Sequence, residues 1–352
     1  MLLGLSEPLS SLVESKFKAA QAAKSLIFSP TELTVIHTTT GLPFQLRYCP
    51  SLAKKPTAQK NETPRTKKLD PFDNPPSDLL ITSVPTTNPT HLLVLNKFPI
   101  ISEHFILATK TNKLQTDQLE QDDLEVTYAC LKAWGNGHAH ERNKRLFAFF
   151  NSGEHSGASQ PHRHLQFLPV ERMMNEEKCS GWELLMDQIM ATPQSVTKGV
   201  PSLKQYPKLP FTHYASVLPS NPTGPQLLKI YQDLYKAAVT SVNEHVQSHP
   251  NDLEIYPKED GSLSISYNLA MTTSAMAICP RRREGNMLQQ DDGSDVGFVA
   301  LNGTILAGTL MVKYQEEWDV LRAEPAKLNT LLEAIGIPVE TEDNKGNGKN
   351  RL

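Results

Sequence analysis

One stretch, residues 151–168, constrains the fold and the chemistry of this chain more than any other: Asn-Ser-Gly-Glu-His-Ser-Gly-Ala-Ser-Gln-Pro-His-Arg-His-Leu-Gln-Phe-Leu. Its residues 162–166 are typical of a β-strand, in which side chains two positions apart share a face. We therefore expect His162, His164 and Gln166 to lie together on one face of a sheet.

A loop rich in glycine and serine comes before this strand and contains Gly153, Ser156, Gly157 and Ser159. Such a loop can turn several backbone N–H groups toward one point, which suits an anionic oxygen. A histidine beside a phosphate-binding loop indicates nucleotidyl transfer through a phosphohistidine.

Neutral imidazole suits this chemistry because it avoids the repulsion between an incoming anion and the oxygens of a phosphate anhydride. We expect the central residue, His164, to be the nucleophile. A backbone carbonyl that accepts its Nδ1–H would leave the lone pair on Nε2. His162 would then support and orient the ring, and Gln166 could donate its amide N–H to a phosphate oxygen.

The pattern His-x-His can instead supply two metal ligands, or two polar residues on a solvated strand. A metal site needs a third ligand, which His138, His140 or His155 could provide. The glycine loop favours phosphate binding over both a metal site and a merely solvated strand.

Composition indicates a globular protein, because 39% of its 352 residues are hydrophobic and 21% are charged. The formal charge of −3 gives no general attraction to nucleic acid. No apolar run approaches the roughly 20 residues that span a bilayer, and Glu7 and Pro8 argue against a signal peptide. We expect neither a nucleic-acid nor a membrane partner, and a monomer.

The four cysteines, Cys49, Cys130, Cys179 and Cys279, are far apart in the chain. This spacing argues against a zinc knuckle or a disulfide framework and favours a reducing compartment. We expect a cytosolic protein, with the nucleus also open.

Strands and helices are interspersed without strict alternation, which predicts an α+β fold with an antiparallel sheet flanked by helices. We expect loops over 50–78 and 284–295 and make no assignment for 305–312. The basic residues 281–283 are either a solvated turn or part of a binding site. Helices are expected over 6–23, from a capping box at Asp117 and Glu120 to Trp134, over 182–191, after Pro225 and over 325–335. Strands are expected over 33–48 (as a pair), 91–95, 104–109, 146–150, 162–166, 211–218, 264–271, 276–279 and 296–301.

Prolines between 193 and 210 suggest a crossing connection between two halves. We predict an N-terminal half over 1–200, which carries the histidine strand and its loop, a C-terminal half over 201–338, and a disordered tail over 339–352.

These motifs resemble the histidine-triad superfamily in its transferase form, which has Gln at the third triad position. The chain is most similar to the fungal diadenosine tetraphosphate phosphorylases, also called ATP adenylyltransferases. Supporting segments occur in the right order: Pro50-Ser-Leu…Lys55-Pro56, Leu95-Asn-Lys-Phe-Pro99, and Ser266-Tyr-Asn-Leu269…Thr272…Pro280-Arg281.

The resemblance implies phosphorolysis of diadenosine tetraphosphate to ATP and ADP, with inorganic phosphate as acceptor and an adenylylated His164. It further implies a C-terminal half like that of ATP adenylyltransferases, and adenylyl sulfate as another donor. A divalent cation, Mg²⁺, would be carried on the substrate phosphates, with no metal site in the protein itself. The matching nucleotide-contacting positions are Lys55, Asn96, Lys97, Asn151, Gly157, Ala158, Ser159, Gln160, Gln166, Thr272, Thr273, Ser274, Cys279 and Arg283.

The sequence departs from the family pattern at 273–275, Thr-Ser-Ala, where a charged and an aromatic residue are expected, and at Arg283, where lysine is expected. A hexose-1-phosphate uridylyltransferase of the same architecture is the alternative enzyme, because it shares the His-x-His-x-Gln core. A hydrolase is disfavoured by Gln166, which stands in place of a third histidine. If the protein is not an enzyme, the alternative is a non-catalytic protein that binds a nucleotide or a metal.

Overall fold

The computed structural model describes residues 3–54, 70–135, 144–174, 178–192, 203–253 and 265–339. Its main feature is an eight-stranded sheet in the order β3-β4-β5-β7-β6-β9-β10-β8. Every neighbouring pair in this sheet is antiparallel. The predicted α+β fold with an antiparallel sheet is therefore confirmed.

The strands of the large sheet are short, and all but β3 and β8 are largely buried. Their bounds are β3 Leu80–Val84, β4 His91–Leu95, β5 Phe105–Thr109, β6 Leu146–Ser152, β7 His164–Pro169, β8 Tyr214–Val217, β9 Ser266–Met271 and β10 Ala275–Arg281.

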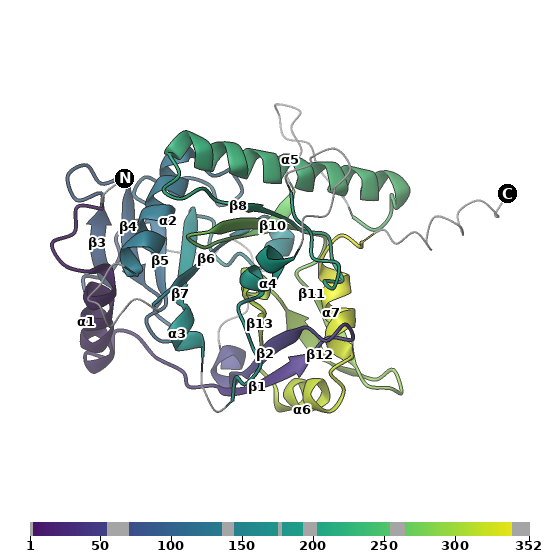
Figure 1. The fold of residues 1–352 in the computed structure, drawn as a ribbon. Helices are drawn as coiled ribbons and strands as arrows, with labels where there is room; N and C mark the ends of the chain where they lie inside the picture. Colours follow the sequence, from purple (N-terminus) through teal and green to yellow (C-terminus); the bar gives the residue numbers. More distant parts are fainter. Residues whose placement is uncertain are drawn as a thin grey trace, which may run out of the picture.

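One face of this sheet is covered by α1 (Leu9–Ala22), α2 (Gln121–Trp134) and the long α5 (Gly224–Ser248), as Figure 1 shows. Their apolar sides share one core with alternate residues of the strands, among them Leu165 and Phe167 of β7. Because side chains alternate along a strand, His164 and Gln166 face the opposite side of the sheet.

That opposite face packs against a second core, built around a three-stranded sheet in the order β1-β2-β13 and a two-stranded hairpin of β11 and β12. Helices complete this layer, in which α6 and α7 lie beside the small sheets in Figure 1. The bounds are β1 Glu32–His37, β2 Pro43–Tyr48, β11 Gly285–Gln289, β12 Asp295–Ala300, β13 Thr309–Val312, α3 Val170–Met173, α4 Leu185–Ala191, α6 Gln315–Ala323 and α7 Lys327–Ile335. Within the described ranges, 3₁₀ turns occur at η1 Pro50–Lys54, η3 Glu154–Ser156 and η4 Gly303–Ala307.

Several local predictions were wrong. The polar stretch 284–295 is not a loop, because β11 lies within it and pairs with β12. The basic turn at 281–283 is not wholly solvated, because β10 continues through Arg281, whose side chain is buried. The strand β3 and the helix α6 were not predicted, and the unassigned 305–312 contains η4 and β13.

The cap of α2 lies three residues later than predicted. Glu120, not Asp117, is the N-cap, and it forms a capping box with Asp123. The Glu120 N–H donates to Asp123 Oδ2 over 2.7 Å. Both carboxylates also bind a buried arginine, which explains why the helix begins here.

The predicted division into halves falls in 193–202, outside the described residues, as do residues 340–352 of the predicted tail. The large sheet nevertheless includes strands from both sides of that division, because β6 pairs with β9. In the described part of the chain, no helix is long and apolar enough to cross a membrane. All four cysteines are free, as their spacing predicted, and all four are buried.

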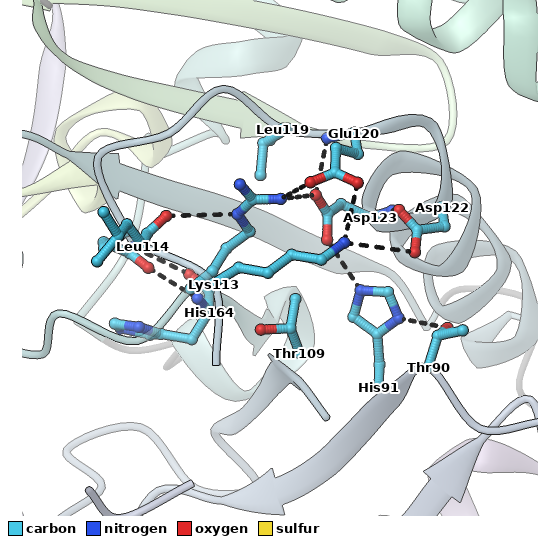
Figure 2. Close-up of polar contacts among 12 residues, drawn as sticks. Thr90, His91, Thr109, Lys113, Leu114, Leu119, Glu120, Asp122, Asp123 and His164 are labelled. Atoms are coloured by element: carbon cyan, nitrogen blue, oxygen red, sulfur yellow. Dashed lines mark hydrogen bonds and ion pairs between the residues drawn. The ribbon is translucent and has the colours of Figure 1, made fainter. Parts of the chain in front are cut away.

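An ionic network, buried except for Glu120, supports β7 on the face opposite His164. Arg163, just before the strand, donates from Nη1 to Glu120 Oε1 over 2.9 Å and to Asp123 Oδ2 over 2.8 Å. Figure 2 shows the His91 ring between Thr90 and Asp123, where His91 Nε2 lies 2.9 Å from Asp123 Oδ1. Burial alone would raise the pKa of Asp123, but hydrogen bonds from His91 and the Glu120 N–H, with the charge of Arg163, lower it.

Replacing the arginine of this network should lower the stability of the folded protein. Arg163→Met would leave the fully buried Asp123 carboxylate without its cation, so we expect the free energy of unfolding to fall by about 3–5 kcal/mol. Arg145→Met is the matched control, since it breaks an exposed pair with Asp187 and should cost at most about 1 kcal/mol. Denaturant unfolding at pH 7 measures both. Equal losses would contradict the anchoring role of Arg163.

Candidate active site

The strand that carries the histidines is held between two neighbours. β5 pairs with it from Phe105↔Phe167 to Ala108↔His164, and β6 pairs with it only as far as Phe149↔Gln166. β7 begins at His164, so the prediction of a strand from 162 was wrong at its first two residues. Before that point the chain pairs elsewhere, because Arg163 N donates to the carbonyl of Lys113 over 2.8 Å.

His164 has the protonation state that a nucleophile needs. Its Nδ1 lies 2.8 Å from the carbonyl oxygen of His162, and because a carbonyl only accepts, Nδ1 must carry the proton. The lone pair is then on Nε2, for which we see no hydrogen-bond partner among the described residues. Burial lowers the pKa of the ring to about 4, against the opposing effect of this bond, so the imidazole is neutral at pH 7.

His162 is held rigidly beside it. Its Nε2 lies 2.8 Å from the carbonyl oxygen of Thr109, and its Nδ1 lies 2.7 Å from Asp70 Oδ2. The Phe72 ring contacts both histidines, with centroids 5.6 Å from His162 and 5.2 Å from His164. Both rings therefore lie on one side, as predicted, and Phe72 shields them from water.

Gln115 fixes the backbone of His164. Its Oε1 accepts from His164 N over 2.7 Å, and its Nε2 donates to the carbonyls of Asn151 (2.7 Å) and His164 (3.1 Å). In a continuous ladder Asn151 would pair with His164 directly. Instead, the buried side-chain amide of Gln115 lies between the two strands and makes the hydrogen bonds that Asn151 and His164 would have made to each other. β6 and β7 are therefore separated at His164.

The glycine loop leaves β6 at this opening. Gly153 and Gly157 have φ angles of 88° and 77°, which favour glycine. A Cβ at Gly157 would lie 2.8 Å from Cβ of Asn302 and 3.0 Å from the Leu301 carbonyl oxygen, so a side chain does not fit either. The residues that follow, Ala158 and Ser159, are exposed. For their backbone N–H groups we see no hydrogen-bond partner among the described residues.

Asn151 ties this loop to the second half of the chain. Its Oδ1 accepts from Asn268 Nδ2 and from Gly303 N, each over 2.9 Å. Asn268 Nδ2 also donates to the Ser156 carbonyl over 2.9 Å, and its Oδ1 accepts from the buried Arg281 guanidinium. In this structure the carbonyl oxygen of the Asn151 side chain therefore holds β6, β9 and η4 together.

Gln166 is half-buried and shares the face of His164. Its Oε1 lies 3.1 Å from Nε2 of His104, and His104 Nδ1 lies 3.0 Å from Asn96 Nδ2. Lys97 is exposed, with Nζ 5.7 Å from the centroid of the Phe98 ring.

Two family models together cover most of the chain. The model described as Ap4A phosphorylase N-terminal domain matches residues 4–187, and the model described as ATP adenylyltransferase C-terminal domain matches residues 207–338. The first alone covers more than half of the sequence.

The chain belongs to the Ap4A phosphorylase family.

Individual relatives agree with this family. The chain is 28% identical to Protein APA1 of Saccharomyces cerevisiae over 338 residues, 94% of each protein. It is also 28% identical to diadenosine 5',5'''-P1,P4-tetraphosphate phosphorylase 2 of S. cerevisiae over 347 residues, 95% of this chain and 96% of the relative. The crystal structure of yeast Ap4A phosphorylase Apa2 superposes with a TM-score of 0.75 at 25% identity, over 96% of this chain and 100% of Apa2.

Not every position that the Ap4A phosphorylase resemblance implied lies at His164. Thr272, Thr273 and Ser274 form the turn after β9, and Met271 pairs with Ala148 while Asn268 pairs with Asn151. The turn is therefore displaced along the sheet from the Asn151 end of β6, where His164 lies.

Cys279 lies level with the site, because it pairs with Asn268, which pairs with Asn151. Its thiol and the Arg283 side chain are nevertheless engaged within the fold. Cys279 is completely buried, and burial raises the pKa of its thiol to about 12. Arg283 is exposed and pairs with Asp252 over 3.0 Å. Lys55 lies outside the described residues, as do His138 and His140.

We find no group of three or more histidine, cysteine or acidic side chains that could hold a metal ion in the described ranges. His155 lies in the loop, where its N–H donates to Ser266 Oγ over 3.1 Å.

The sequence arguments missed four residues that shape the site, namely Asp70, Phe72, His104 and Gln115. His104 could have been noticed, because it stands at the head of a strand that neighbours the histidine strand. Asp70, Phe72 and Gln115 lie in connections between elements and are brought to the site only by tertiary pairing.

The hydrogen bonds of Gln115 can be tested by replacing its amide with a carboxyl group of the same shape. In Gln115→Glu the carboxylate would face two carbonyl oxygens, which should raise its pKa above the ordinary value of about 4.3. The folded state then favours the protonated acid. The free energy of unfolding, relative to the natural protein, should therefore fall as pH rises from 5 to 8, by about 2 kcal/mol or more.

Denaturant unfolding at several pH values measures this loss. Gln232→Glu is the matched control, because Gln232 is exposed on α5, and its difference from the natural protein should not change with pH. Parallel curves for the two variants would show that Gln115 makes no such bonds.

Proposed function

We propose that this chain cleaves diadenosine tetraphosphate by phosphorolysis to ATP and ADP, with His164 carrying the adenylyl group between two half-reactions. The observation that carries the proposal is the bond from His164 Nδ1 to the carbonyl of His162, which leaves a neutral ring with its lone pair on Nε2. The family supports the substrate, since an Apa2 structure is described as a complex with Ap4A.

In the first half-reaction, Nε2 of His164 attacks the phosphorus next to one adenosine. A nitrogen–phosphorus bond forms, the bond from that phosphorus to its bridging oxygen breaks, and ATP leaves. The ring gains positive charge, which the His162 carbonyl stabilises through Nδ1–H. In the second, an oxygen of inorganic phosphate attacks the same phosphorus, the nitrogen–phosphorus bond breaks, and ADP leaves with His164 neutral again.

The surroundings of His164 suit an anionic transition state. Residues Gly157, Ala158, Ser159 and Gln160 are exposed or half-buried, and their backbone N–H groups are the donors proposed for the phosphate. Gln166, on the same face, adds a side-chain amide. Lys97 is exposed and supplies a nearby cation, and Lys55 is expected to supply another, because a substrate with about four negative charges needs cations within roughly 8 Å.

We propose that Mg²⁺ enters with the substrate, bound to its phosphates, since carboxylates and phosphate oxygens are its usual ligands. Adenylyl sulfate is proposed as a further donor, because it presents the same adenylyl phosphorus to His164. The cytosolic or nuclear location, the monomeric state and the lack of nucleic-acid and membrane partners remain predictions from the sequence.

A direct test supplies purified protein with diadenosine tetraphosphate and labelled inorganic phosphate. Label should enter ADP and not ATP. His164→Ala should lose turnover by a factor on the order of 10⁴ or more, as for other covalent nucleophiles, whereas His162→Ala should retain part of it. Repeated turnover without phosphate, beyond one cleavage per protein molecule, would indicate a hydrolase. Reaction with uridylyl sugars in place of the dinucleotide would indicate the uridylyltransferase alternative.

The pH dependence of the first half-reaction follows from the lowered pKa of His164, about 4. The neutral form is the nucleophile, and it remains fully populated from pH 8 to pH 6. An imidazole with an ordinary pKa of 6.5 would lose about fourfold of its neutral form at pH 6. We therefore expect the single-turnover rate of ATP release to stay level over this range, and a fourfold fall would contradict the buried neutral ring.

A further inference from the structure

Three polar side chains on neighbouring strands form a row that ends at the proposed site of transfer. Asn96 follows β4, His104 precedes β5, and Gln166 lies on β7. Asn96 Nδ2 lies 3.0 Å from His104 Nδ1, and His104 Nε2 lies 3.1 Å from Gln166 Oε1. The backbone reinforces the row, because Asn96 N donates to the His104 carbonyl over 3.0 Å.

The orientation of the row is set at one end by the main chain. Phe98 N lies 2.9 Å from Asn96 Oδ1. A backbone N–H can only donate, so the oxygen of the Asn96 amide must face Phe98 and its NH₂ must face His104. The Asn96 amide therefore cannot be reversed without losing this bond.

The tautomer of His104 follows. An NH₂ group only donates, so His104 Nδ1 must accept and cannot carry a proton. The proton of the neutral ring is then on Nε2, which donates to Gln166 Oε1. His104 and His164, two neutral rings in one site, thus have opposite tautomers, since His164 carries its proton on Nδ1.

We infer that Asn96 and His104 are positioning residues that turn the Gln166 amide so that its NH₂ group faces the phosphate being transferred. This inference rests on the proposed function. With Oε1 occupied by His104, the two N–H donors of Gln166 remain for a non-bridging oxygen. The reverse orientation would place a carbonyl oxygen against an anion, which is repulsive.

The row is needed because Gln166 alone could take either orientation. It is half-buried, and its two amide ends are nearly the same size. His104 is only 9% exposed, and its ring centroid lies 6.4 Å from that of Phe149, so the imidazole is itself held in place. A rigid donor behind Gln166 therefore selects one of two otherwise similar states.

The tautomers can be observed without any turnover. In the folded protein with ¹⁵N-labelled histidine, long-range ¹H–¹⁵N spectra at pH 7.5 should show His104 protonated on Nε2 and His164 on Nδ1, each assigned by its absence in a His→Phe variant. His213 gives an internal reference, because its Nδ1 faces the Phe211 carbonyl and its Nε2 accepts from Tyr206 N. A proton on Nδ1 of His104 would overturn the inference.

The effect on Gln166 can be measured with phosphorothioate substrates. Sulfur accepts hydrogen bonds poorly, so the two diastereomers of a dinucleotide with sulfur at the attacked phosphorus should react at different rates, by roughly tenfold to a hundredfold. His104→Phe should lose most of this difference although Gln166 is present, and Asn96→Leu should reduce it. Gln166→Ala should abolish it.

His213→Phe is the matched control, because it also removes a buried imidazole. That ring bridges two backbone groups, and it lies just before β8, which is four strands away from β7 in the large sheet. It should keep the full difference, even if it lowers stability. If His104→Phe slows turnover but preserves the difference between diastereomers, the role of His104 is structural only. If the natural protein shows no difference yet performs phosphorolysis, the inference fails and the proposed function stands; if it performs no phosphorolysis, the proposed function fails.

Discussion

The hydrogen bond from His164 Nδ1 to the carbonyl of His162 is the interaction on which the site depends. It exists because the chain changes partners just before β7: Arg163 N pairs with Lys113, whereas His164 N pairs with the amide of Gln115. A regular ladder through 162–166 would have directed these groups to neighbouring strands. The break therefore gives the ring its tautomer, and burial then keeps the ring neutral.

The rest of the fold keeps that break in place from both faces of the sheet. On the face covered by α1, α2 and α5, Arg163 is fixed by Glu120 and Asp123. On the face that carries His164, Asn151 joins the glycine loop to β9 and η4, so the second half of the chain supports the site. Because β6 pairs with β9, the sheet that presents the nucleophile includes strands from before and after the proline-rich connection.

Periodicity was enough to predict the antiparallel sheet and most of its strands, because these depend on alternation along each strand. The chemistry of imidazole was enough to predict that a backbone carbonyl would hold Nδ1 of His164. Sequence could not show that Gln115 would enter the ladder or that Asp70 would reach His162, since both contacts join segments 36 to 92 residues apart. The resemblance implied nucleotide contacts for Asn96 and Arg283, and it gave no sign that their side chains would bind His104 and Asp252. Polar loops such as 284–295 were misjudged because hairpin pairing with β12 outweighs local composition.

The most direct test of the account is intact-mass measurement of the protein after brief exposure to diadenosine tetraphosphate with phosphate left out, followed by peptide mapping. The account predicts the gain of a single adenylyl group, located on the peptide that contains His164, and its disappearance when phosphate is added. Rapid cleavage of the dinucleotide with no such gain, or an adenylyl group on another residue, would contradict it.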